Sequence, residues 1–100
     1  MSIDAKAVRL ERDSGHGRYS YTFPDATQAE MSYVERSPGI VTITHTYTPS
    51  QHRGQGVAAV LVGRAIEDFH AGGKKVIPAC WLARQQFDEH PEWADLLARV

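Results

Sequence analysis

A chain of 100 residues is long enough for one domain with a thin core and leaves no room for a second, so we expect a single domain over residues 1–100. Its formal net charge is −1, because 11 basic and 12 acidic residues are interspersed along the chain. A nucleic-acid-binding protein gathers its positive charge on one face, so we expect no nucleic acid among the partners.

The cysteine content and the N-terminus predict where the protein is found. A single cysteine, Cys80, excludes an intrachain disulfide and suits a reducing compartment. Residues 1–6 contain no apolar stretch of signal-peptide length, and no segment is long and apolar enough to span a bilayer. These features predict a cytoplasmic protein that binds no membrane.

The first half of the chain predicts four strands joined by short turns. Val8 and Leu10 alternate with charged residues in a short first strand, and residues 13–17 form a turn. Further turns are expected at residues 24–27 and 37–39, and β-branched residues fill a fourth strand over 40–48. One face of the second strand should hold Tyr19, Tyr21 and Phe23, and one face of the third Ala29, Met31 and Tyr33. Short turns of this kind indicate an antiparallel meander.

The second half predicts a helix between two strands. A helical face of apolar residues follows a glycine-containing loop and ends at Gly72 and Gly73; it holds Ala58, Leu61, Val62, Ala65 and Phe69. Residues 76–80 predict a fifth strand, which the strand–helix–strand crossover makes parallel to the fourth. A short helix is expected over residues 83–89, and Pro91 begins another turn or helix that carries Trp93, Leu96 and Leu97.

The junction between the fourth strand and the helix has the features of an anion site. The first N–H groups of a helix have no intrahelical partner and carry the positive end of its dipole. Gly54 and Gly56 lack the Cβ that would keep a ligand away from the backbone, and Arg53 adds a full positive charge. We therefore expect a phosphate group at this junction.

Two other interpretations of the glycines are open at this point. Residues 54–59 also fit the Gly-x-Gly-x-x-Ala dinucleotide pattern, which requires an acidic residue about 20 positions further on. Residues 76–80 hold no carboxylate, and the chain is too short for a six-stranded doubly wound sheet. The simpler alternative is a glycine turn without a ligand, which an isolated Gly-x-Gly would favour. Arg53 and the motifs that follow argue against it.

Three motifs resemble one family. The run Gln51-x-x-Gly54-x-Gly56 resembles the acyl-CoA pyrophosphate loop of the GNAT superfamily of N-acetyltransferases. Residues 75–81 and 90–97 are similar to the Pro-x-Cys strand and the His-Pro-Glu-aromatic tail of its small, single-domain YjdJ-type branch. The resemblance implies a minimal GNAT fold of the α+β class, close to a three-layer α/β arrangement. Its sheet is mixed and mostly antiparallel, and the fifth strand splays from the fourth at the CoA site.

The same resemblance implies acetyl-CoA as cosubstrate and an amine of a peptide, protein or small molecule as acceptor. The chain has no room for the extra elements that wall the acceptor side in larger relatives, so that side is open or completed by a second subunit, and we expect a monomer or homodimer. No metal is expected, since His45, His52 and Cys80 lack ligand spacing. The residues implied to bind CoA are Tyr47, Thr48, Gln51, His52, Arg53, Gly54, Gln55, Gly56, Val57 and Ala58.

The catalytic groups depart from the pattern that is usual in this family. Family members commonly protonate the departing thiolate with a tyrosine after the fifth strand, and this chain has no tyrosine there. Cys80 and His45 are the substitutes we predict, on neighbouring strands and facing one gap. Cys80 could relay the acetyl group or donate a proton; direct attack with His45 or water as base is equally compatible. A buried, inert cysteine and a non-catalytic acyl-CoA-binding module are the alternatives.

Overall fold

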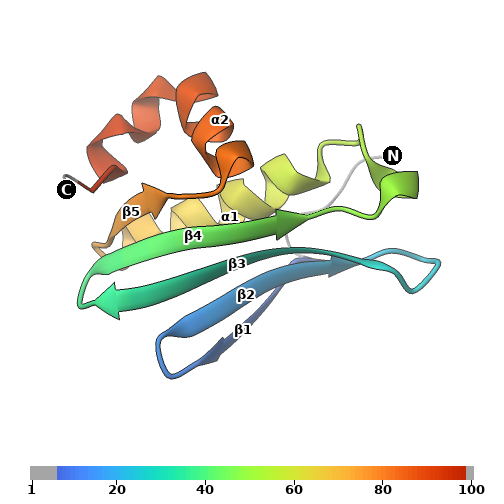
Figure 1. Cartoon of the computed structure of the whole chain (residues 1–100), viewed down its shortest axis with the longest axis horizontal. Helices are drawn as coiled ribbons and strands as arrows, with labels where there is room; N and C mark the ends of the chain where they lie inside the picture. The colour runs from blue at the N-terminus through green and yellow to red at the C-terminus, as the bar shows by residue number, and fades with distance from the viewer. Residues whose placement is uncertain (1–6, 99–100) are drawn as a thin grey trace.

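The computed structural model describes residues 7–98, which form a five-stranded sheet with helices on one face (Figure 1). The strands follow one another across the sheet in chain order, and they are β1 (Arg9–Asp13), β2 (His16–Thr22), β3 (Gln28–Ser37), β4 (Ile40–Tyr47) and β5 (Lys75–Pro78). The first four are antiparallel, whereas β5 runs parallel to β4. The α+β class and the mixed, mostly antiparallel sheet are therefore confirmed.

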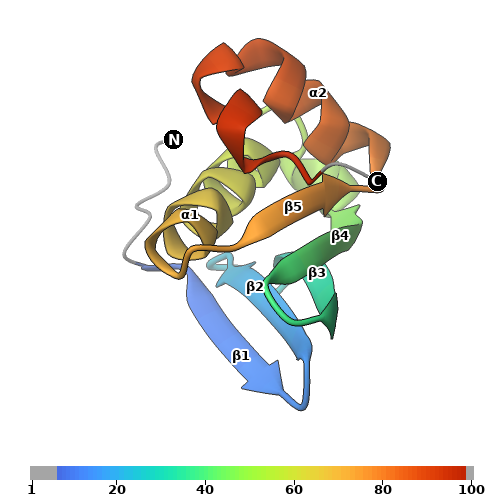
Figure 2. The same ribbon diagram turned by 90° about the vertical axis from the view of Figure 1, so that its left-hand side faces the viewer.

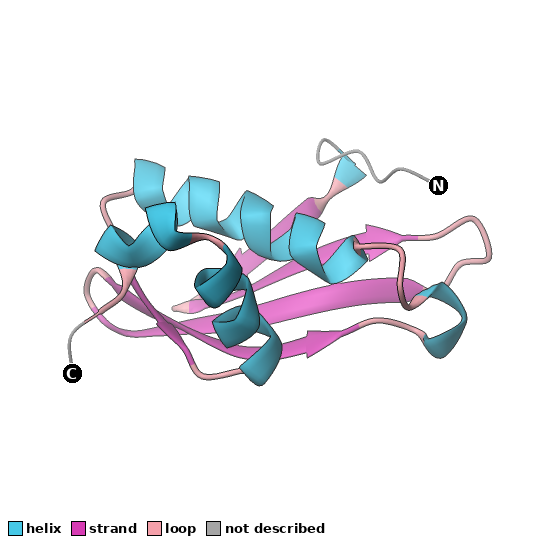
Figure 3. Ribbon diagram, turned by 90° about the horizontal axis from the view of Figure 1, so that it is seen from above, coloured by secondary structure: helices cyan, strands magenta, loops and turns pink. Residues whose placement is uncertain are grey.

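In the described part of the chain, two α-helices and the short 3-10 helices η2 and η3 accompany the sheet. Helix α1 (Val57–Ala71) makes the crossover from β4 to β5, and α2 (Trp81–Glu89) follows β5. The 3-10 helices are η2 (Ser50–His52), between β4 and α1, and η3 (Pro91–Leu96), after α2. Both α1 and α2 lie over the same face of the sheet, which leaves its other face open (Figure 3). Within residues 7–98, no helix is long and apolar enough to cross a membrane.

Some element boundaries differ from those expected. The turn predicted over residues 13–17 is only Ser14 and Gly15, with φ of 44° and 82°, because a tight two-residue turn of this kind matches the twist of a hairpin. Strand β5 ends at Pro78 rather than at residue 80, and α2 begins at Trp81 rather than at residue 83. Cys80 therefore stands between a strand and a helix, not within the strand.

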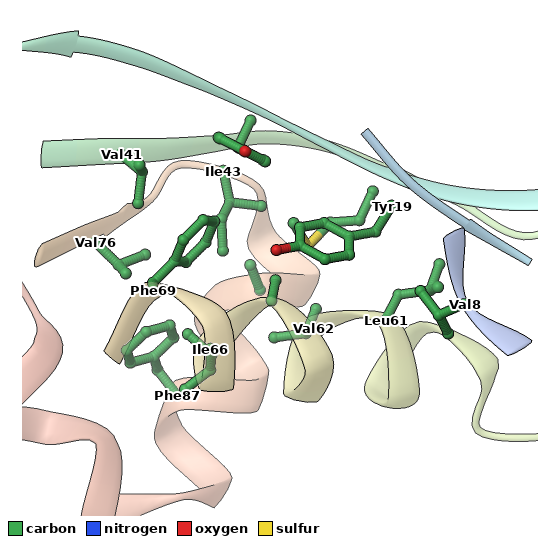
Figure 4. Close-up of a cluster of buried hydrophobic side chains, with 14 of the residues drawn as sticks. Val8, Tyr19, Val41, Ile43, Leu61, Val62, Ile66, Phe69, Val76 and Phe87 are labelled. Carbon is green, nitrogen blue, oxygen red and sulfur yellow. The ribbon is translucent and has the colours of Figure 1, made fainter. Parts of the chain in front are cut away.

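The core lies between the sheet and α1 (Figure 4). The predicted inner residues of β3 are all buried, and Phe69 of α1 meets the rings of Tyr19 and Tyr33 edge-on. The expected helix face needs one correction, because Ala58 is only partly buried and the buried residues of α1 are Val57, Leu61, Val62, Ala65, Ile66 and Phe69. Ile66 is buried because α2 covers that side of α1, where Phe87 lies beside it (Figure 4).

One glycine in β2 makes room for an aromatic ring. Gly17 pairs with Tyr33 across the β2–β3 ladder, and a Cβ added at Gly17 would lie 2.1 Å from the Tyr33 ring. The bare backbone of Gly17 thus lets the ring lie flat on the sheet. The neighbouring phenol of Tyr19 donates a hydrogen bond of 2.8 Å to Asp68 of α1, which ties the helix to the sheet.

A bulge in β4 changes which side chains face the helices. Tyr33 pairs with Ile43 and Ser32 pairs with His45, so Thr44 is an extra residue in β4. Beyond the bulge, Thr46 pairs with the fully buried Met31 and therefore lies on the helix side. Neighbouring residues of a strand point to opposite faces, so His45 lies on the open side.

Strands β4 and β5 part at the same point. Their pairing ends at Ile43 and Pro78, and the N–H groups of Ala79 and Cys80 both donate to the carbonyl of Ile43, at 3.1 Å each. Beyond Ile43, β4 continues to Tyr47 without β5 beside it. The gap beside the end of β4 therefore arises where β5 ends and the chain passes into α2.

The outer edge of β5 is also occupied. Val76 forms a parallel bridge with Leu97, and the N–H of Ala98 donates to the Val76 carbonyl at 2.9 Å. The segment after η3 thus runs along the edge of β5 that faces away from β4, and Figure 2 shows this C-terminal part of the chain returning to β5.

Candidate functional site

A cavity of about 730 Å³ opens where β4 and β5 part. The end of β4, the loop that follows it and the first turns of α1 and α2 form its walls. Of the residues predicted for CoA, the lining contains Tyr47, Thr48, His52, Arg53, Gly54, Gly56, Val57 and Ala58. Gln51 and Gln55 are exposed and lie outside that lining.

The wall of the cavity that α2 provides was not predicted from the sequence. Trp81 and Leu82 line the cavity, and Gln85 and Gln86 do so one turn further along the helix. The helical spacing of these residues was a usable signal, but only with α2 beginning at Trp81. The lining also includes Ala59 of α1 and Thr44 and Thr46 of β4.

The start of α1 offers unpaired N–H groups to this cavity. The first intrahelical bond runs from Val60 N–H to the Gly56 carbonyl, 3.2 Å, so the three N–H groups before it, at residues 57–59, have no helical acceptor. No side chain caps the helix, and its first turn contains no acidic residue. The positive end of a 15-residue helix therefore meets the cavity without a protein anion to neutralise it.

The two loop glycines give a ligand access to these groups. Gly54 and Gly56 adopt φ of 85° and 79°, in the left-handed region where a side chain is strained. A Cβ built on either glycine meets no atom within 4 Å, so it would occupy open space beside the helix start. Arg53 lies next to them and donates from Nε to the Thr48 carbonyl at 3.2 Å.

His52 contacts the β2–β3 turn instead of extending into open solvent. Its Nε2 lies 2.9 Å from Oδ2 of Asp25, and its ring stacks on Phe23 with centroids 3.6 Å apart. Hydrogen bonds from the side chain and backbone of Thr27, and then from His52, hold the pKa of Asp25 well below its usual range. The idea that His52 donates to a phosphate therefore competes with a contact already made within the protein.

Cys80 lies at the gap between β4 and β5. Its Sγ is 3.2 Å from Oγ1 of Thr46, and its side chain is half-buried. Burial raises the pKa of the Cys80 thiol, but the Thr46 hydroxyl and the first N–H groups of α2 lower it by more, so the net shift is downward. The N–H groups in question belong to Leu82 and Ala83, in the first turn of α2.

His45 lies on the opposite side of the sheet from the Thr46 side chain that meets Cys80. The bulge at Thr44 turns His45 to the open face, where its Nε2 lies 3.9 Å from Oε1 of Glu30. His45 and Cys80 both border the cavity, but His45 does so from the open side of the sheet. Thr46 takes the place beside the thiol. Within residues 7–98, no three His, Cys, Asp or Glu side chains gather in a way that could hold a metal ion.

Comparison with known proteins places this geometry in a family. The solution structure of a GCN5-like protein from Staphylococcus aureus has the same fold, with a TM-score of 0.68 at 18% sequence identity over 94% of this chain and 91% of that one. Residues 18–96 match the family model for the GCN5-related N-acetyltransferases, a span that includes the glycine loop and Cys80. The chain belongs to the GCN5-related N-acetyltransferase family.

Proposed function

We propose that this protein, as one domain over residues 1–100, transfers an acetyl group from acetyl-CoA to a primary amine. One observation carries the proposal: the uncapped start of α1 and the gap between β4 and β5 open into the same cavity. CoA requires both, an anion site for its diphosphate and a slot for its extended pantetheine arm. A glycine turn without a ligand would need neither.

The residues of the loop and helix start would hold the diphosphate. The N–H groups of residues 57–59 and the positive end of α1 supply donors, and the bare backbone of Gly54 and Gly56 admits the phosphates. Arg53 adds charge at the solvent side. The arm would then follow β4 beyond Ile43, where the strand has no neighbour on the β5 side, and bring the thioester close to Cys80.

The placement of Cys80 and His45 favours direct attack by the amine. The attacking amine must lose a proton, and the departing CoA thiolate must gain one. His45 on the open face would accept the amine's proton, and the Cys80 thiol on the helix side would protonate the thiolate. An acetyl-cysteine relay would instead start from the Cys80 thiolate, which the lowered pKa of the thiol favours; the neighbouring hydroxyl of Thr46 is not a base that could take the thiol's proton.

The first test is ligand binding. At a hundredfold excess over its dissociation constant, a ligand that binds only the folded state stabilises it by about 2.7 kcal/mol. CoA and acetyl-CoA should therefore raise the melting temperature, and NADH and ATP should do so far less. Equal shifts with all four would remove the case for a CoA site.

The second test separates catalysis from binding. Acetyl transfer from acetyl-CoA to a panel of primary amines, followed by mass spectrometry, should show turnover with some of them. A non-catalytic acyl-CoA-binding module is the second candidate, because every tyrosine of the chain precedes Cys80 and the position of the family's usual acid holds none. Tight CoA binding with no transfer to any amine would favour that candidate.

A further inference from the structure

The β2–β3 turn, far from the glycine loop in sequence, is joined to it by one compact contact. Asp25 in the turn meets Nε2 of His52 at 2.9 Å, and the rings of His52 and Phe23 stack with an interplanar angle of 3°. His52 is the last residue of η2, directly before Arg53 and the glycines. We call Phe23, Asp25 and His52 the hairpin clamp.

The hairpin side of the clamp is firmly held. Phe23 is almost completely buried, and Oδ1 of Asp25 accepts hydrogen bonds from the backbone and the hydroxyl of Thr27, at 3.0 and 2.6 Å. The other carboxylate oxygen is thereby aimed at His52. Ala26, which stands between Asp25 and Thr27 in the chain, has a φ of 73°, a costly conformation for alanine that the turn nevertheless maintains. The turn therefore presents a preformed carboxylate to the loop.

The glycine loop between η2 and α1 is a segment that needs contacts from outside to hold one conformation. With Gly54 and Gly56 the segment between η2 and α1 has wide conformational freedom, and ordering it costs entropy whenever a ligand binds. Helix α1 fixes the C-terminal end of the segment. The N-terminal end is fixed to the rest of the fold through His52, since the bonds of Arg53, from its N–H to the Ser50 carbonyl and from Nε to the Thr48 carbonyl, are local to this segment.

We propose that the hairpin clamp holds the phosphate loop in its binding conformation, so that the β2–β3 turn is part of the CoA site without touching the ligand. This proposal rests on the proposed function, because it assumes that the loop receives CoA. Phe23, Asp25 and His52 are then positioning residues: they lower the cost of binding and take no part in acetyl transfer.

The test uses His52→Ala, with His52→Phe as partial rescue and His70→Ala as control. Phenylalanine keeps the stacking on Phe23 and loses the bond to Asp25. His70 is an exposed histidine in the last turn of α1, outside the lining of the cavity. Backbone order parameters of residues 53–57 are measured by NMR on the free protein, and CoA affinity by calorimetry.

For His52→Ala, the loop order parameters should fall from about 0.85, typical of rigid backbone, towards 0.6 or below, typical of flexible backbone. The dissociation constant for CoA should rise about tenfold, the effect of losing one hydrogen bond to a charged group. In the transfer assay KM for acetyl-CoA should rise while kcat is unchanged. His52→Phe should lie between wild type and His52→Ala, and His70→Ala should match wild type.

Unchanged loop order in His52→Ala would overturn the clamp, whatever happens to CoA binding. A loosened loop with unchanged CoA affinity would overturn its positioning role. Failure of the wild-type protein to bind CoA would instead overturn the proposed function. The order parameters are measured without ligand, so they decide independently whether the clamp orders the loop.

Discussion

Gly56→Ala is the sharpest probe of the phosphate loop, because the chain offers a matched control in Gly73→Ala. Both glycines have positive φ, 79° and 69°, and a Cβ built on either meets no atom within 4 Å. Gly56 is the residue before α1, and Gly73 follows the end of the same helix. The two methyl groups are thus equally strained and equally free of clashes, but only the first lines the cavity.

The stability cost should be the same for both variants. Placing an L-residue in the left-handed region costs about 1–2 kcal/mol. For a domain of this size, each kcal/mol lowers the melting temperature by roughly 4–8 °C, so both variants should melt about 4–16 °C below wild type. Neither loss exceeds the stability of an ordinary domain, about 5–15 kcal/mol, and both proteins should remain folded at 25 °C.

The effect on CoA affinity should differ between Gly56→Ala and Gly73→Ala. A methyl group at Gly56 stands where the diphosphate must approach the first N–H groups of α1, so at least one hydrogen bond to a charged phosphate is lost. Such a bond contributes about 1.5–3 kcal/mol, which corresponds to a rise in the dissociation constant of roughly 10- to 150-fold. Calorimetric titration with CoA at 15 °C measures it, and circular dichroism melts measure stability. Equal CoA affinities in the two variants would show that the diphosphate lies elsewhere.

Three further predictions concern the thiol, the core and one ion pair. Cys80→Ser keeps a hydrogen-bond partner for the Thr46 hydroxyl but removes the acidic thiol, so the rate of acetyl transfer should fall while CoA affinity hardly changes. Full activity would contradict the acid role of Cys80, and an acetyl adduct on wild-type Cys80, detected by mass spectrometry, would favour a relay. Gly17→Ala forces a Cβ into the Tyr33 ring and should destabilise the fold by about 1–3 kcal/mol in denaturant titrations, and a wild-type midpoint would refute that packing. The Lys74 ammonium, 2.6 Å away, and then the Gly39 N–H lower the pKa of Glu35, so the pair stabilises the fold above the ordinary carboxyl value of 4.5 and less as pH falls through the lowered one. Lys74→Met should thus cost about 0.5–1 kcal/mol at pH 7 and progressively less in acid, and a cost that is constant with pH would exclude the ion pair as its cause.

The period of apolar residues was enough to predict the strands and the crossover helix. Ala29, Met31 and Tyr33 are buried as expected, because an antiparallel strand with one covered face alternates strictly. The burial of Ile66 was not predictable in this way. It depends on α2 packing against a second side of α1, which is a tertiary contact between segments far apart in the chain.

The site was predictable where its chemistry is local and not where it depends on register. The glycine loop and helix start are contiguous, so their spacing reveals them. The side of the sheet on which His45 lies was not predictable, because it depends on the bulge at Thr44, where no glycine or proline signals one. The partner of His52 was equally hidden, since Asp25 is 27 positions away and belongs to a turn between two other strands.

The bridge between Val76 and Leu97 bears on how the sheet avoids other chains. A strand edge with free N–H and C=O groups is a template for pairing with another molecule, which leads to aggregation. On one side of the sheet, residues 97 and 98 occupy the groups of β5. On the other, β1 is short and mostly charged, with Arg9, Glu11, Arg12 and Asp13 all exposed. The two edges are thus protected by different means, and the protection of β5 depends on a few residues of the C-terminal segment: loosening the contact of Leu97 with Val76 would expose backbone groups of β5 to pairing with another chain.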